Sequence, residues 1–362
     1  MNSIHYVGLD IHPSTTELAI IKTSGPIFQR QRCRTSISDL VETLAKIPRP
    51  IHIAMEEGPL ADWLYRNLLP YVDHITVAEP RRNRLIAKDS DKDDALDAEK
   101  LAQLLRGGYL KPVHHAHSLD RMMFKQHVAL YHDCVRQRVR TANRIIGFVG
   151  RHGVFVREPA FAPVEKRPRI LARLPAHPHL RKDLKLLWQT YDLAAKHVTD
   201  MRRRLKRLAR KEEPIRRFVQ LPGIKWVRAA TFFAYIDTPG RFASKQKLWK
   251  YAGLGLEHRQ SGARHQRVRL ARRANRVLKY ILLGAARSAV VKGSNPFAHQ
   301  YHNWLAKATP PPVALRNTAR SLAVTLWVMW KKGVAYDPNR VANSAQLETA
   351  LTPSTPANGR IS

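Results

Sequence analysis

Cysteine is almost absent from this chain, which has two cysteines in 362 residues. Cys33 and Cys134 alone give no disulfide framework and no cysteine-rich metal site. Long apolar runs are absent too: the stretch 313–330 is interrupted by Arg316 and Arg320, so nothing is expected to span a bilayer. The N-terminus lacks the basic start and apolar segment of a signal peptide. Together these absences predict a cytoplasmic location.

Acidic residues are also scarce, with 28 Asp and Glu against 63 Lys and Arg and a formal net charge of +35. Such an excess of positive charge predicts a polyanionic partner. No strongly amphipathic basic helix with a Trp or Phe face stands out, so nucleic acid is favoured over a membrane surface. The length allows two or three domains with at least one sizeable core. The hydrophobic content of 44% argues against wholesale disorder.

The first hundred residues alternate between strand and helix patterns. Strands are predicted over 5–11, 15–23, 26–33, 51–57 and 74–80. Helices are predicted over 36–47, over about 58–70, and from residue 89. Three strands followed by helix, strand, helix, strand and helix is the order of RNase H-like α/β domains, although order alone discriminates weakly between folds.

The middle of the chain carries a heptad pattern. A long helix is predicted over 121–150, and Gly and Pro then break the pattern. Apolar residues next alternate spacings of three and four, which predicts a coiled-coil seam available for dimer contacts. The seam consists of Leu184, Leu187, Tyr191, Ala194, Val198, Met201, Leu205 and Leu208. The alternative is an amphipathic helix packed inside its own domain.

The C-terminal part is predicted to be mainly helical. Helical stretches follow in the region that begins at 221–236, from near Asn275, and up to about Trp330. The end of the chain has the composition of a disordered tail. The predicted division is an RNase H-like domain (1–150), a linker and coiled coil (151–212), a mainly α domain (213–335) and a disordered tail (336–362).

Five aspartates crowd into residues 89–97 of this basic chain. Acids favour helix N-termini because the helix dipole is positive there. The dipole does not, however, select a face. Asp94 and Asp97 continue the apolar stripe of the helix toward its N-terminus, so both are expected to face the core side. Inward-facing carboxylates repel each other unless a cation or donors compensate.

Two further acids are placed at the ends of strands that are expected to be neighbours. Asp10 ends the first strand, and Glu56 or the adjacent Glu57 ends the fourth. Together with Asp94 and Asp97, they would form an oxygen-only cage suited to Mg²⁺ or Mn²⁺. Two such ions can activate a nucleophile and stabilise the leaving oxygen in phosphodiester chemistry.

These residues resemble the DEDD transposases of the IS-one-ten insertion-sequence family, now described as bridge-RNA-guided recombinases. The resemblance runs to about residue 335 and includes "VGLDIH", "AMEEGP" and "DALDAEKLA". It implies a RuvC-like domain whose metal-binding acids are Asp10, Glu56, Asp94 and Asp97. Many members separate the glutamate from the next glycine by two residues, whereas here Glu57 and Gly58 follow directly.

The segment 251–286 resembles the family's C-terminal transposase segment, and "LPGI" at 221–224 matches its usual opening. The resemblance implies that Ser261 is the catalytic nucleophile. A lone Ser before Gly is by itself weak evidence, because most such pairs are turns. Arginines around it could hold a scissile phosphate and neutralise its transition state. The candidate nucleic-acid contacts are Arg259, Arg264, Arg267, Arg269, Arg272 and Arg273.

The resemblance further implies a homo-oligomer, a dimer or a tetramer, in which the acids of one protomer meet the serine of another. It also implies a guide RNA that pairs with both DNAs, while the protein reads mainly backbone and shape. Two alternatives remain open from the residues alone. One is a structure-specific nuclease in which metal-activated water attacks, and the other is a non-catalytic nucleic-acid-binding protein.

Overall fold

The computed structural model describes residues 3–24, 27–80, 94–116, 118–259, 267–271 and 273–341, with the backbone alone for 27–28, 94–95, 257–259 and 267–269. The chain divides into two compact units, residues 1–122 and 123–362. The sequence instead places the first boundary at residue 150, and its division into four segments remains a prediction. No helix among the described residues is long and apolar enough to cross a membrane.

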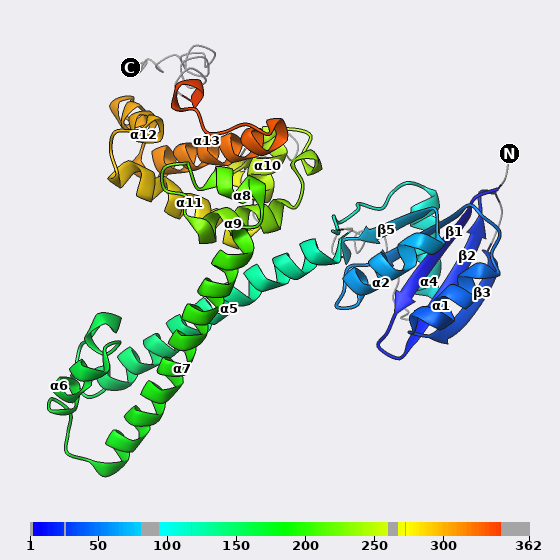
Figure 1. Cartoon of the computed structure of the whole chain (residues 1–362). Helices are drawn as coiled ribbons and strands as arrows, with labels where there is room; N and C mark the ends of the chain where they lie inside the picture. The colour runs from blue at the N-terminus through cyan, green and yellow to red at the C-terminus, as the bar shows by residue number, and fades with distance from the viewer. Residues whose placement is uncertain are drawn as a thin grey trace, which may run out of the picture. The chain divides into compact units, whose positions relative to one another are not determined.

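The first unit is built on a five-stranded mixed sheet (Figure 1). Its strands are β1 (His5–Ile11), β2 (Thr15–Lys22), β3 (Ile27–Arg34), β4 (Ile51–Glu56) and β5 (His74–Ala78). The strand order is β3-β2-β1-β4-β5. The pairs β1–β2 and β2–β3 are antiparallel, and β1–β4 and β4–β5 are parallel. All five predicted strands are confirmed, and the topology is compatible with the RNase H-like α/β domain that the sequence predicts.

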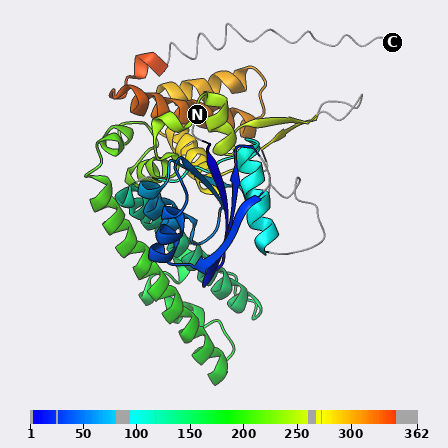
Figure 2. The same cartoon turned by 90° about the vertical axis from the view of Figure 1, so that its right-hand side faces the viewer.

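Helices cover both faces of this sheet. Helices α1 (Ile37–Ala45) and α2 (Ala61–Leu68) lie on one face, where Val7 and Leu9 of β1 join their apolar side chains in one core. Helix α4 (Asp94–Arg106) lies on the other face, as Figure 2 shows with α4 in cyan. Ser36 caps α1 by accepting a hydrogen bond from the N–H of Asp39, as its position before the helix predicts.

Helix α4 packs backbone to backbone on β1 at Gly8. A Cβ at Gly8 would lie 1.9 Å from the carbonyl oxygen of Ala98 and 2.6 Å from the nitrogen of Ala102. At the other end of the helix, the Arg106 guanidinium donates to the carbonyl of Lys22, which pairs with His5 at the start of β1. Helix α4 therefore runs antiparallel to β1, and its N-terminus lies over the end of the sheet where β1 finishes.

Gly8→Ala is expected to lower the free energy of unfolding by about 1–3 kcal/mol, because the added methyl group meets backbone atoms that cannot rotate away. Urea denaturation of the two proteins measures this loss. Gly58→Ala is the matched control, since its Cβ would have no atom within 4 Å and the expected change is within about 0.5 kcal/mol. Equal stability of the Gly8 and Gly58 variants would contradict the close packing of α4.

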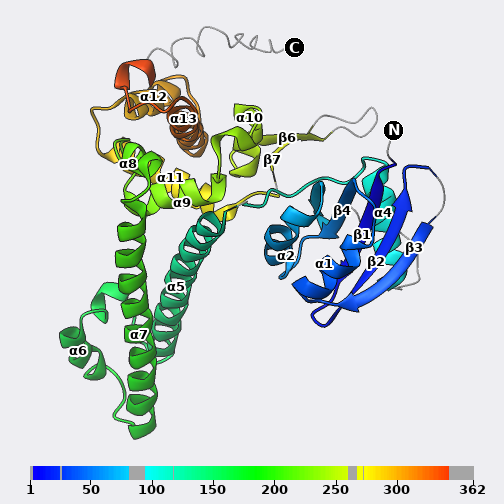
Figure 3. The ribbon, with the colours of Figure 1, turned by 45° about the vertical axis from the view of Figure 1, so that its right-hand side comes forward.

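Two long helices dominate the second unit: α5 (Leu119–Gly150) and α7 (Pro178–Ala209), joined through α6 (Arg167–Leu171). Figure 3 shows α5 and α7 side by side. The heptad positions of α7 are buried or partly buried, as the pattern predicts, but they are covered within the chain. The cause is a complementary apolar stripe on α5, which includes Val128, Tyr131, Ile145 and Val149. The structure thus has the alternative arrangement, an amphipathic helix packed inside its own domain, and this seam is not free for dimer contacts.

The rest of the second unit is a helical bundle with one two-stranded sheet. Its elements are α8 (Glu213–Phe218), α9 (Trp226–Ile236), α10 (Lys245–Tyr251), β6 (Leu256–Arg259), β7 (Arg267–Leu270), α11 (Arg276–Val291), α12 (Pro296–Ala306) and α13 (Pro311–Lys332). Gly223 of "LPGI" has φ +79°, and a Cβ there would lie 2.2 Å from the carbonyl oxygen of Ala285, which explains the glycine.

The segment predicted as a tail begins with six described residues, 336–341, and its remainder, 342–362, lies outside the described residues. Two of the six contact the bundle. The ring of Tyr336 stacks on Phe297, and Val341 is buried while its carbonyl accepts from Gln300. Tyr336 and Val341 pack on apolar residues of the bundle. The polar composition of the residues that follow gave no sign of this packing.

His132 of α5 is held neutral inside the second unit. Burial, and secondarily the charge of Arg136, lowers the pKa of His132 from 6.5 to about 4. The hydroxyl of Thr231 donates to the carbonyl of Val227, so His132 Nε2, 2.9 Å from that hydroxyl, is the donor to it. The fold therefore favours the neutral ring.

Stability is expected to fall as pH drops from about 6.5 toward 4, because the unfolded chain then binds a proton at His132 that the folded chain excludes. The titration of His132 should lower the free energy of unfolding by roughly 2 kcal/mol over this range, after allowance for the partial exposure of its side chain. His132→Gln retains a donor for Thr231 and removes the titration. The difference between the free energies of unfolding of the two proteins should change over this pH range, and a constant difference would contradict the assignment.

Candidate functional site

Asp10 and Glu56 lie side by side at one end of the sheet. The parallel register pairs Leu9 with Met55, so the next residues on the two strands are Asp10 and Glu56. Because side chains alternate along a strand, Asp10 shares its face with Gly8, the face that α4 covers. Glu56 is on the same face. The Asp10 side chain is 24% exposed and Glu56 is exposed, so both carboxylates are open to solvent beyond the start of α4.

Glu57 is directed differently from Glu56. β4 ends at Glu56, and the backbone N–H of Glu57 still donates to the carbonyl of Ala78 on β5 at 2.9 Å. Because consecutive side chains along a strand alternate, a continuation of β4 by one residue would direct Glu57 to the opposite face of the sheet, that of α1 and α2. This geometry favours Glu56 as the acid that accompanies Asp10.

A third acid on this face, Glu17, escaped the sequence interpretation. The antiparallel register places Glu17 directly opposite Asp10, and side chains directly opposite each other share a face. Arg32, the partner of Glu17 on β3, forms an ion pair with it at 3.1 Å. The sequence signal was present, since strands 5–11 and 15–23 form a hairpin whose pairing could have been counted from the turn.

His12 is a second missed neighbour. Its Nε2 lies 3.0 Å from Oδ2 of Asp10, and its side chain is 45% exposed. The two-residue spacing from Asp10 along an extended chain was the available signal, because it puts both side chains on one face. His12 can thus orient the Asp10 carboxylate.

The helix acids Asp94 and Asp97 lie in the first turn of α4, above the same end of the sheet. The apolar stripe that follows them is confirmed, with Ala98, Leu101 and Ala102 buried. The expectation that Asp97 faces the core is wrong: its side chain is 53% exposed, with Lys100 Nζ 3.9 Å away. The sheet covers the apolar face of α4 at Ala98 and beyond, but it ends near the first turn of the helix, where Asp97 lies. For Asp94 the backbone alone is described.

The structure therefore brings the strand ends of Asp10 and Glu56 and the N-terminal turn of α4 to one end of the sheet. Among the side chains that the structure describes, no three His, Cys, Asp or Glu converge closely enough to hold a metal ion. The donor set itself consists of carboxylate oxygens, the ligands that Mg²⁺ and Mn²⁺ prefer.

The serine segment falls between β6 and β7, which pair antiparallel with Arg259 opposite Arg267. Ser261, Arg264 and Arg272 lie outside the described residues. Arg259, Arg267 and Arg269 are placed by their backbone on the two strands, and Arg273 is exposed just beyond them. After this pair, α11 begins at an Asn275 cap that accepts from the N–H of Leu278.

Two family models match the chain. Residues 7–152 match the DEDD model of IS110-type proteins, described as "Transposase", and residues 215–303 match the "Transposase IS116/IS110/IS902 family". The matched ranges contain Asp10, Glu56, Asp94 and Asp97 in the first case and Ser261 in the second.

Full-length relatives support the same class. The transposase for insertion sequence element IS1328 of Yersinia enterocolitica is 23% identical over 93% of this chain and 99% of that protein. The transposase for insertion sequence element IS1111A of Coxiella burnetii is 22% identical over 80% of this chain and 78% of that protein. A putative transposase of Sinorhizobium fredii is 24% identical over 91% of this chain and 85% of that protein.

A mixed sheet with acids at one end, followed by a helical unit that matches a second transposase model, defines an enzyme that cleaves and recombines DNA. The chain belongs to the IS110 family of DEDD transposases.

Proposed function

We propose that this transposase cuts and exchanges the DNA strands of an insertion sequence with an acidic site and a serine nucleophile. The acidic site would be RuvC-like and consist of Asp10, Glu56, Asp94 and Asp97. The observation that carries the proposal is the placement of Asp10 and Glu56 at one level of neighbouring parallel strands, under the N-terminus of α4. Like charges this close are destabilising unless something compensates for them.

Two of the acids on this face have a described partner. Arg32 neutralises Glu17, and His12 contacts Asp10. Glu56, Asp94 and Asp97 would supply the remaining oxygens for Mg²⁺ or Mn²⁺, which fits a purely carboxylate donor set. When bound, the metal would supply Lewis acidity at the scissile phosphate.

The serine step follows from the chemistry of a hydroxyl at a phosphodiester. Ser261 Oγ forms a bond to phosphorus and loses its proton, and the bond from phosphorus to the 3′ oxygen breaks. The products are a 5′-phosphoserine link and a free 3′-hydroxyl. Arg259 and Arg267, opposite each other on β6 and β7, would neutralise the charge that builds up on the phosphoryl oxygens.

In this proposal a structured guide RNA selects the target DNA. The protein acts as a dimer or a tetramer, in which the acids of one copy meet the serine of another. The support is the family resemblance together with the net charge of +35, which suits binding to two nucleic acids at once. Since the seam of α7 is covered within the chain, dimer contacts would use other surfaces. The transposase relatives favour an enzyme over a non-catalytic binding protein.

Glu56→Gln is expected to reduce Mg²⁺-dependent strand cleavage more than about a hundredfold and to weaken Mg²⁺ binding, because it removes one charged ligand. Cleavage of a labelled element-end DNA and calorimetric Mg²⁺ titration give the two readouts. Glu57→Gln, directed to the other face of the sheet, is the matched control and should stay within about threefold of the parent. A larger loss in the Glu57 variant would reverse the assignment.

Ser261→Ala is expected to abolish the covalent protein–DNA adduct and strand cleavage together, because no other hydroxyl replaces the nucleophile. Denaturing gels of reactions with labelled DNA and candidate guide RNA detect both. Mg²⁺ binding should remain unchanged in this variant, which separates the two parts of the site. Undiminished cleavage without an adduct would instead identify a nuclease that uses water.

A further inference from the structure

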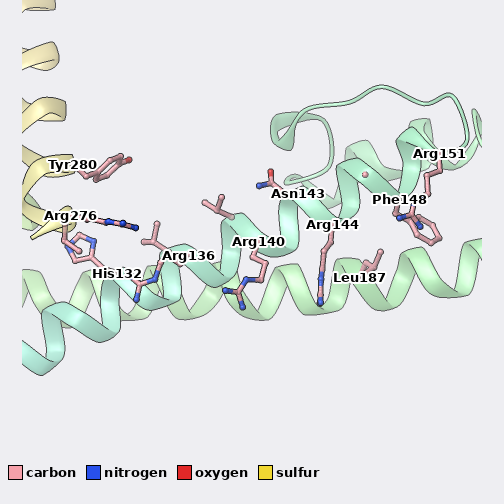
Figure 4. A pocket seen from close by; sticks show the side chains of 14 residues that line it. His132, Arg136, Arg140, Asn143, Arg144, Phe148, Arg151, Leu187, Arg276 and Tyr280 are labelled. Carbon is pink, nitrogen blue, oxygen red and sulfur yellow. The ribbon is translucent and has the colours of Figure 1, made fainter. Parts of the chain in front are cut away.

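An open groove of about 1190 Å³ runs along α5 to the first turn of α11 (Figure 4). Its wall is a row of arginines, Arg136, Arg140 and Arg144 on α5 and Arg151 just after the end of that helix, with Arg276 approaching from α11. All the residues that line it belong to the second unit. None of the residues that line the groove belongs to the acidic site or to the arginines of β6 and β7.

The α5 arginines recur at intervals that keep them on one side of the helix. Spacings of four residues separate Arg136, Arg140 and Arg144, and Arg151 follows seven residues later. At 1.5 Å per residue the helical part of the row, Arg136 to Arg144, covers about 12 Å, and Arg151 follows just beyond the end of α5. This length suits a few consecutive phosphates, which lie about 3.4 Å apart along a strand stacked as in B-DNA and farther apart along an extended strand.

Most of these arginines have no acidic partner among the side chains that the structure describes. Among the described residues, Arg140, Arg144, Arg151 and Arg276 make no ion pair. Arg136 alone does so, with Asp133 at 3.1 Å. Of the described residues that line the groove, none is acidic. Guanidinium groups held near one another without a counter-charge attract a chain of phosphates.

The floor of the groove is apolar and its end is aromatic. Val135, Val139 and Leu187 contribute apolar surface, and Val139 is 42% exposed. Tyr280, on the first turns of α11, is 76% exposed, and Phe148 lines the other end. Duplex DNA hides its bases and would contact only the arginines. An unpaired strand presents base faces that can cover apolar side chains and stack on an aromatic ring.

We propose that this groove binds an unpaired nucleic-acid strand, with its phosphates on the α5 arginines and a base stacked on Tyr280. A second copy of the chain suits the groove poorly, because each copy carries a net charge of +35. The proposal rests on the nucleic-acid binding of the proposed function, but on neither Ser261 chemistry nor the metal. An unpaired DNA strand and an unpaired segment of a guide RNA both expose phosphates and base faces. The groove could therefore bind either of them.

The test is binding of a fluorescent twelve-nucleotide strand, as DNA and as RNA, to the full chain carrying Ser261→Ala in EDTA. The groove variant is Arg140→Gln, Arg144→Gln and Arg151→Gln together. Its matched control is Arg202→Gln, Lys206→Gln and Arg207→Gln on exposed positions of α7 outside the groove. Both remove three charges. Since all six side chains are exposed, the thermal unfolding transitions should coincide.

The groove variant is expected to bind at least tenfold more weakly than the control, with its salt slope reduced by about 2, as three lost phosphate contacts require. Tyr280→Ala should weaken binding about tenfold further, and Tyr280→Phe should retain it. Equal loss for DNA and RNA, or loss for one of them, supports the proposal and identifies the source of the strand.

Three results would overturn the proposal. Equal weakening by the groove variant and the control would show that only overall charge matters. A loss confined to duplex DNA of the same length would show that no unpaired strand is bound. A change of oligomeric state in the groove variant, measured by light scattering, would show that a second copy occupies the groove. Because neither metal nor Ser261 takes part, failure here leaves the cleavage chemistry untouched, and the reverse also holds.

Discussion

The contact between the backbones of α4 and β1 at Gly8 is the constraint on which the acidic end of the sheet depends. No side chain fits between the glycine and the carbonyl of Ala98, so the helix lies as close to the sheet as backbone atoms allow. With its axis antiparallel to β1, the helix delivers its first turn, and with it Asp94 and Asp97, to the end where Asp10 and Glu56 emerge. The absence of a side chain at Gly8 thus allows the packing that brings the start of α4 to this end of the sheet.

The electrostatics of the two units differ in kind. In the first unit, acids are gathered in one row across three strands, Glu17, Asp10 and Glu56, where Arg32 forms an ion pair with Glu17 and His12 contacts Asp10. In the second, arginines are spread along α5, and among the described side chains of the groove only Arg136 has an acidic partner. The proposed function would use both, since a basic surface can hold phosphates and carboxylates can recruit a divalent cation.

Much of the fold could be predicted from local pattern. Short strand-like stretches located the five strands, and the apolar stripe of α4 located its buried face. The heptad pattern of α7 was correct as a pattern, yet it could not say which surface covers it, because the matching stripe lies on α5, some fifty residues earlier. The candidate site was predicted in its acids but not in Glu17 or His12, whose relevance depends on strand register and strand face.

The sequence by itself determined which residue types are present and their periodicity: a basic chain, acids at strand ends, a cluster of aspartates at a helix start, and motifs of the transposase family. These follow from local chemistry and spacing alone. Only the tertiary structure decided that Glu56 rather than Glu57 shares a face with Asp10, that Asp97 is open to solvent, and that the α7 seam is covered within the chain. Each of these depends on what lies across from a residue, and pairing between distant segments is fixed by packing, which no local pattern encodes.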